Sequence, residues 1–132
     1  MRMLSNRKRE AGFTLLELMI VVGIVAILTV MALASYNFAT QKTRRNAAKA
    51  CLTEGAQQVE RYYTTNMTYL GVGVPNCSAD VRNFYTVSFN GTPSATAYEL
   101  QAAPRGKQAS DKCGTMSVNE VNRKQAATTD CW

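Results

Sequence analysis

An uncharged apolar stretch near the start of the chain constrains its fold more than any other feature. No charged residue lies between Leu18 and Gln41, and the most apolar part runs from Leu18 to Ala34. That part has about the minimum length that spans a bilayer as an α-helix. The alternative is a helix buried in a protein core, but a chain of 132 residues has little core in which to hide so apolar a segment. We therefore expect a membrane anchor.

The residues before the anchor indicate its orientation and processing. Positive charges precede it, so the positive-inside rule places the N-terminus in the cytoplasm and the bulk of the chain outside. A secretory signal is cut after its hydrophobic region. Here the only small-residue boundary, Ala11-Gly12 before Phe13, lies ahead of that region, and cleavage there would keep the hydrophobic segment. The sequence thus predicts a leader over 1–12, a hydrophobic helix over 13–40 and a globular head over 41–132.

The side chains that most enzymes need are absent or scarce. The chain has no His, which excludes Ser/His and Cys/His nucleophile pairs and any zinc site that contains His. Its nine acidic residues form no cluster in the sequence that would hold calcium or magnesium. We expect no enzymatic activity, no metal and no cofactor.

Glu17 is the anomaly in the hydrophobic helix. A carboxylate one turn inside a membrane costs on the order of 2.5 kcal/mol or more unless it has a partner. Cleavage after Gly12 would create an α-amino group on Phe13, four residues away and at similar depth. That amine could belong to the same chain or to a neighbouring one. The alternative is a Glu17 side chain that stays at the membrane surface.

Helical periodicity continues beyond the anchor to about Thr65. Its apolar positions recur at spacings of four and three residues, whereas Arg45 and Lys49 fall mainly on other faces, which we expect to be solvated or packed on neighbours. The expected buried face consists of Ala48, Leu52, Gly55, Val59 and Tyr62.

Alternating patterns follow the helix. A loop over 71–76 precedes two alternating segments, 84–89 and 97–102, which predict a hairpin. Another loop over 104–111 leads to a third strand around Met116 and Val118, and the tail over 122–132 offers a fourth strand at the edge. The expected fold is α+β, with a three- to four-stranded antiparallel sheet whose apolar face covers the second half of the helix.

The four Cys residues indicate disulfides, because the head should lie outside the cytoplasm. Three pairings are open. We favour Cys113 with Cys131, closing the C-terminal region, and Cys51 with Cys77, joining the helix to the following loop. The alternative of catalytic or metal-binding cysteines lacks a CxxC motif and a His partner.

The segment GFTLLELMIVVGIVAIL resembles the signal and N-terminal helix of type IV pilins and related pseudopilins. The resemblance implies the pilin fold, cleavage after Gly12 by a prepilin peptidase and methylation of the new Phe13 amine. It also implies that Glu17 pairs with the Phe13 amine of an adjacent subunit.

Later segments are similar to the PilE-type minor pilins of type IVa pili: CLTEGAQQVERYYTTNMTY from Cys51, YELQAAPRGKQ from Tyr98, CGTMSV from Cys113 and the final CW. This similarity implies a minor structural subunit that primes pilus assembly and links other minor pilins to the major pilin. The precursor would be a single-pass inner-membrane protein with a periplasmic head, served by the inner-membrane assembly platform. After assembly it would lie in the surface pilus.

Three alternatives remain: a major pilin, a DNA-binding uptake pilin and, ranked lower, a type II secretion pseudopilin. DNA binding would need a basic patch, for which the sequence offers a late group: Arg105, Lys107, Lys112, Arg123 and Lys124. A second basic group follows the anchor directly, and we favour a solvated, subunit-facing role for it over contacts with lipid or DNA. It consists of Lys42, Arg44, Arg45 and Lys49.

Overall fold

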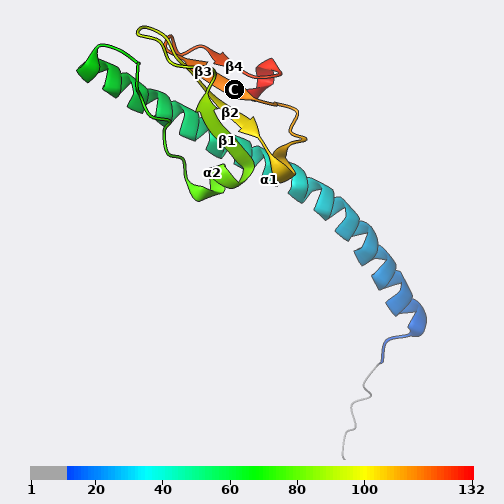
Figure 1. Cartoon of the computed structure of the whole chain (residues 1–132). Coiled ribbons are helices and arrows are strands. Elements are labelled where there is room, and N and C mark those ends of the chain that lie inside the picture. Colours follow the sequence, from blue (N-terminus) through cyan, green and yellow to red (C-terminus); the bar gives the residue numbers. More distant parts are fainter. Residues whose placement is uncertain (1–11) are drawn as a thin grey trace, which may run out of the picture. The chain divides into compact units, whose positions relative to one another are not determined.

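The computed structural model describes residues 12–132, so the predicted leader, apart from Gly12, lies outside the described residues. The chain divides into two compact units, Met1–Asn37 and Phe38–Trp132, which we describe separately. The long helix α1 (Leu15–Asn66) contributes to both of them (Figure 1). We call the unit from Phe38 to Trp132 the head.

Helix α1 has a defined signal at each end. Before its first turn, the Thr14 hydroxyl accepts a hydrogen bond from the Glu17 N–H at 3.2 Å, as in an N-terminal capping box. At the other end Met67 adopts a positive φ of 56°, and its N–H donates to the Tyr63 carbonyl at 2.7 Å, which is a left-handed C-terminal cap. The predicted helix, from Phe13 to about Thr65, is therefore confirmed within two residues.

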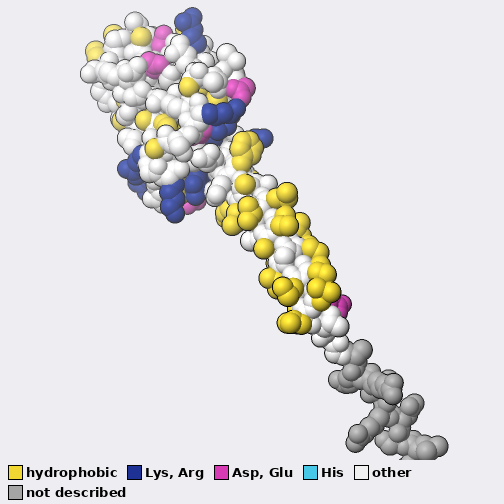
Figure 2. All heavy atoms as spheres, turned by 90° about the vertical axis from the view of Figure 1, so that its right-hand side faces the viewer, with side chains coloured by type: hydrophobic (Ala, Val, Ile, Leu, Met, Phe, Trp, Pro, Cys, Tyr) yellow, Lys and Arg dark blue, Asp and Glu magenta, His cyan; other side chains and the backbone are white. Residues whose placement is uncertain are grey.

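In the first unit, α1 is exposed along its apolar residues. It carries the one stretch in the described residues that is long and apolar enough to cross a membrane. Figure 2 shows this stretch covered with hydrophobic side chains. An exposed apolar surface of this extent indicates a membrane or protein partner, because water would not support it.

In the head, α1 packs on a four-stranded antiparallel sheet of order β1-β2-β3-β4. The strands are β1 (Tyr85–Phe89), β2 (Glu99–Pro104), β3 (Met116–Asn119) and β4 (Lys124–Gln125). Each strand pairs with the next along the chain, and Leu100 of β2 lies opposite Val118 of β3. The predicted hairpin, third strand and edge strand are all confirmed.

The core lies where α1 meets β2 and β3. Leu52 and Val59 of the helix are fully buried together with Leu100, Ala102 and Met116 of the sheet. In β2 the buried residues alternate with less buried ones, and in α1 they recur every three or four residues. Each element therefore has one apolar face, and the two faces pack against each other.

The structure corrects the sequence analysis in the connecting segments. A short helix, α2 (Ala79–Phe84), precedes β1, so Phe84 ends a helix and does not begin a strand. A single 3-10 turn, Gly106–Gln108, lies within the predicted loop over 104–111. Another, Thr129–Cys131, follows β4 near the C-terminus.

Two disulfides cross-link the head, Cys51 with Cys77 and Cys113 with Cys131. They are the two pairs favoured from the sequence. The first joins α1 to the segment before α2, and the second closes the C-terminal segment. A bridge that closes a loop of this size stabilises a fold by about 3 kcal/mol in the chain-entropy model.

At Gly55, helix α1 packs tightly against Pro75 and Leu100. A Cβ at this position would lie 2.9 Å from two ring carbons of Pro75 and 3.0 Å from a methyl of Leu100. Real Cβ atoms do not come this close, so the position requires glycine. The contact fixes Pro75 against the helix, two residues before the disulfide at Cys77.

We predict that Gly55→Ala lowers the free energy of unfolding of the head by about 1 to 3 kcal/mol through overpacking. Helix propensity alone would give the opposite sign, since Ala is the better helix former. Chemical denaturation followed by circular dichroism measures the effect. Gly73→Ala is the control, because no atom lies within 4 Å of a Cβ there. Equal stability of wild type and Gly55→Ala would contradict the packing argument.

Candidate functional site

Three arginines from different segments meet around Phe84 at the end of α2. The guanidinium carbon of Arg44 lies 3.7 Å from the centroid of the Phe84 ring, a cation-π contact. The Arg105 N–H donates to the Phe84 carbonyl at 2.8 Å, and the Arg105 guanidinium donates to the Arg82 carbonyl. We call Arg44, Arg82 and Arg105 the arginine cluster.

Two of the three arginines in the cluster border a pocket of about 460 Å³. Arg82 and Arg105 line it together with Asn76 from the loop before α2 and Thr86 from β1. Strand β1 is an edge strand, since it pairs with β2 alone. The pocket thus lies between an open sheet edge and the loop that the disulfide at Cys77 holds to α1.

No carboxylate among residues 12–132 forms an ion pair with the arginine cluster. The two ion pairs of this part of the chain are Arg45–Asp111 and Lys112–Asp130. Figure 2 shows Lys and Arg side chains gathered over one part of the head. Guanidinium groups that lack an acidic partner attract anions, and their planar fork of N–H donors suits phosphate oxygens.

The predicted late basic group has members with different surroundings. Arg105 belongs to the arginine cluster, and the exposed Lys107 lies two residues further on, in the 3-10 turn. The Lys112 ammonium instead pairs with Asp130 at 2.6 Å, and that of Lys124 lies 5.3 Å from the centroid of the Trp132 ring. Arg123 is exposed next to Lys124.

Sequence reasoning missed Arg82 and assigned Arg44 to a different group. The placement of Arg82 and Arg44 in one cluster depends on α2, because this helix carries Arg82 and also the Phe84 ring that Arg44 contacts. Arg82 and Val81 are neighbours in a helix whose buried side is Val81, so the exposed arginine could have been found only once that helix was recognised.

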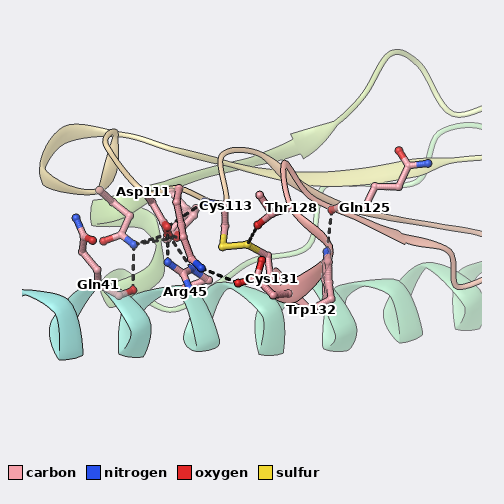
Figure 3. The surroundings of a disulfide bond; sticks show 12 residues. Gln41, Arg45, Asp111, Cys113, Gln125, Thr128, Cys131 and Trp132 are labelled. Atoms are coloured by element: carbon pink, nitrogen blue, oxygen red, sulfur yellow. Dashed lines mark hydrogen bonds and ion pairs between the residues drawn. A yellow bond between two sulfur atoms is a disulfide. The ribbon is translucent and has the colours of Figure 1, made fainter.

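Arg45 was wrongly expected on a solvated face. It is 9% exposed, and its guanidinium donates to both carboxylate oxygens of Asp111, with Nε at 3.0 Å from Oδ2. Figure 3 shows the pair between α1 and the C-terminal segment, beside the disulfide of Cys113 and Cys131. A buried arginine of this kind serves the fold and is not available to a ligand.

Asp111 collects further hydrogen bonds. The Tyr85 hydroxyl donates to it at 3.0 Å, Gln108 Nε2 at 2.9 Å and the Cys113 N–H at 3.2 Å. Burial by itself would raise the pKa of Asp111, but the hydrogen bonds, led by those from Arg45, outweigh it and hold the pKa at about 2. Burial also raises the pKa of Tyr85 to about 12, so this hydroxyl remains a donor.

We predict that Asp111→Asn destabilises the head by about 3 to 5 kcal/mol near neutral pH, because it leaves the buried charge of Arg45 uncompensated. The folded pKa of Asp111 lies below its ordinary value, so its stabilisation is complete above about pH 4 and declines as the pH falls toward 2. Thermal unfolding of wild type and variant between pH 2 and 7 measures this.

Asp130→Asn is the matched control, since it removes a carboxylate whose side chain is 62% exposed and whose ion pair is screened by solvent. We expect little change there. A gap between wild type and Asp111→Asn that is independent of pH down to 2 would exclude the assigned role of the carboxylate.

The proposed N-terminal residues lie at the start of the described chain. Gly12, Phe13 and Glu17 are all exposed, and Glu17 stands in the first turn of α1. Its pairing with the Phe13 amine requires cleavage and stays a prediction. The negative charge of Glu17 in the first turn of α1 also suits the positive end of the helix dipole.

Comparison with protein families gives two matches. Residues 34–117 match the model described as "Type IV minor pilin ComP, DNA uptake sequence receptor". Residues 7–33 match the prokaryotic N-terminal methylation motif. The first match includes the whole arginine cluster and excludes Arg123 and Lys124. No curated protein matches the chain.

Two solved structures are similar to the chain. A type IV pilin from Shewanella oneidensis is 30% identical, with a TM-score of 0.58 over 70% of this chain and 97% of that one. The non-core minor pilin PilV of Neisseria meningitidis is 20% identical, with a TM-score of 0.57 over 70% of this chain and 91% of that one. The second likeness concerns the fold alone.

Proposed function

The chain belongs to the type IV minor pilin family of the DNA uptake sequence receptor ComP, and from this membership we propose that its head binds duplex DNA. It has the type IV pilin fold and is a structural subunit, not an enzyme. On the sequence alone, DNA uptake ranked below a role in priming assembly and linking pilins. The family match supports the DNA alternative over that role.

The observation that carries the proposal is the arginine cluster without carboxylate partners in the described chain. Arg44 is held against Phe84 and the Arg105 guanidinium donates to the Arg82 carbonyl, so these two guanidinium groups are positioned before any ligand arrives. Preorganised guanidinium groups bind phosphates with little loss of side-chain freedom. Lys107 adds a fourth positive charge close by in the sequence.

Contacts with DNA phosphates provide most of the affinity of such a basic surface for DNA. Each phosphate that a protein neutralises releases condensed counterions and adds about −0.9 to the slope of log K against log salt. The predicted patch members Arg105 and Lys107 belong to this surface. The other three residues of the predicted patch have less support as phosphate contacts. Asp130 offsets the charge of Lys112, and Arg123 and Lys124 lie outside the family match.

The anchor and leader complete the proposal. The N-terminal motif supports cleavage after Gly12 by a prepilin peptidase and methylation of Phe13. The precursor would span the inner membrane once, and assembly would carry it, with other minor pilins and the major pilin, into a surface pilus. Glu17 would then face the Phe13 amine of a neighbouring subunit.

We expect the double variant R82Q/R105Q to bind duplex DNA at least tenfold more weakly than wild type at low salt. Its slope of log K against log salt should be shallower by about 2, for two lost phosphate contacts. Fluorescence anisotropy on the full chain in neutral detergent, repeated over a salt series, provides both numbers. R123Q/K124Q is the control, because it also removes two positive charges, and an equal loss in R123Q/K124Q would move the interface to the C-terminal group.

Processing has a separate test. Gly12→Val should leave the leader attached, because the peptidase would meet a branched side chain at the cut site. Mass spectrometry of the N-terminal peptide from native membranes should find N-methylated Phe13 in wild type and the intact precursor in the variant. A mature N-terminus at Phe13 in Gly12→Val would show that Gly12 is not required.

A further inference from the structure

The two basic groups expected from the sequence meet around α1 at the point where this helix enters the head. In the 3-10 turn of the late group, Gln108 Nε2 donates to the backbone carbonyl of Gln41 at 3.0 Å. Three residues after Gln41, the Arg44 guanidinium lies over the Phe84 ring, and the Arg105 N–H donates to the Phe84 carbonyl. The fold therefore places the late group beside the first charged residues after the anchor.

The basic side chains at this place face different sides of the helix. Lys42 and Arg44 are two residues apart, which turns an α-helix by about 200°. Lys42, Arg105 and Lys107 are exposed and Arg44 is partly exposed, and none of the four forms an ion pair within residues 12–132. We call these four residues the basic collar. Its positive charge surrounds α1 and suits an anion that can approach the helix from all sides.

The basic collar lies at the depth of the lipid headgroups. The uncharged part of α1 from Leu18 to Gln41 has 24 residues, and its length is about 36 Å at 1.5 Å per residue. The hydrocarbon core of a bilayer is about 30 Å thick, and the headgroup layers bring the total to about 40 to 45 Å. A span that begins at Leu18 therefore leaves the hydrocarbon near Phe38 and reaches the far headgroups at Lys42. The exposed Tyr36 lies at the interface, where tyrosines are enriched.

We propose that, before assembly, the basic collar binds the phosphates of anionic phospholipids in the leaflet from which α1 emerges. Basic residues just outside a membrane helix are attracted to anionic headgroups over about a Debye length. A DNA duplex would approach α1 from one side, whereas lipid headgroups surround it, which matches the opposite directions of Lys42 and Arg44. The inference goes beyond the proposed function, because it concerns the chain in the membrane and stands whether or not the head binds DNA.

This contact gives assembly a second effect on the head. As long as the chain spans the membrane, lipid phosphates occupy Arg44 and Arg105, which also belong to the arginine cluster. Extraction into a fibre removes α1 from the lipid and leaves these guanidinium groups open to other phosphates.

The test reconstitutes the full chain in phosphatidylcholine bilayers with spin-labelled phosphatidylglycerol or spin-labelled phosphatidylcholine. Electron spin resonance gives the fraction of each labelled lipid that the protein immobilises, and the ratio of the two fractions measures the preference for the anionic lipid. K42Q/R44Q should lower this ratio by about twofold or more at low salt. The comparison with wild type is needed because the basic leader also attracts anionic lipid at the other end of the helix. K42Q/K107Q should lower the ratio similarly and leaves the contact of Arg44 with Phe84 in place.

R61Q/R123Q is the matched control, since it removes two exposed charges from the other end of the head. Arg61 lies 19 residues after Lys42, about 28 Å further along α1, and it lines a pocket with Asn122, the neighbour of Arg123. The lipid ratio of this control should equal that of wild type. An unchanged ratio in both K42Q/R44Q and K42Q/K107Q, or an equal decrease in R61Q/R123Q, would overturn the inference. The samples contain no DNA, so a failure of DNA binding leaves this result unaffected.

Discussion

The buried carboxylate of Asp111 sets the arrangement of the head. It lies where the C-terminal segment crosses α1, and groups from the helix, from β1 and from its own turn all donate to it. A buried charge is tolerated only with such partners. The position of Arg45 along α1 therefore fixes where the C-terminal segment docks, and with it the start of β3 and the Cys113–Cys131 bridge (Figure 3).

Much of this fold could be predicted because its elements have strong periodic patterns. The apolar anchor, the three-and-four spacing of Leu52 and Val59, and the alternation around Leu100 each depend on local sequence alone. An extracytoplasmic head with four cysteines indicated disulfides, and the pairing favoured among the three possible ones is the pairing that the structure shows. The order of the four strands is that of the chain, which is the simplest connection between antiparallel neighbours.

The errors arose where a tertiary contact decides the role of a residue. Arg45 lies three residues before Ala48, on the same stripe as Leu52, so spacing alone would place it in the core. Its charge was taken as a sign of exposure, because its partner Asp111 lies 66 residues away. Helix α2 has six residues, too few to show a clear period, and without it the arginine cluster could not be assembled from the sequence.

The bond between Cys51 and Cys77 has a mechanical consequence. This disulfide attaches the loop that carries Asn76 directly to α1, in addition to the connection along the chain. The arginine-bearing helix α2 begins just beyond that loop. A pull applied at α2 passes to the helix α1 across the bridge, bypassing the 25 residues between the two cysteines. The tension reaches α1 without loading the tip of the helix or the loop after it, so neither has to resist unravelling.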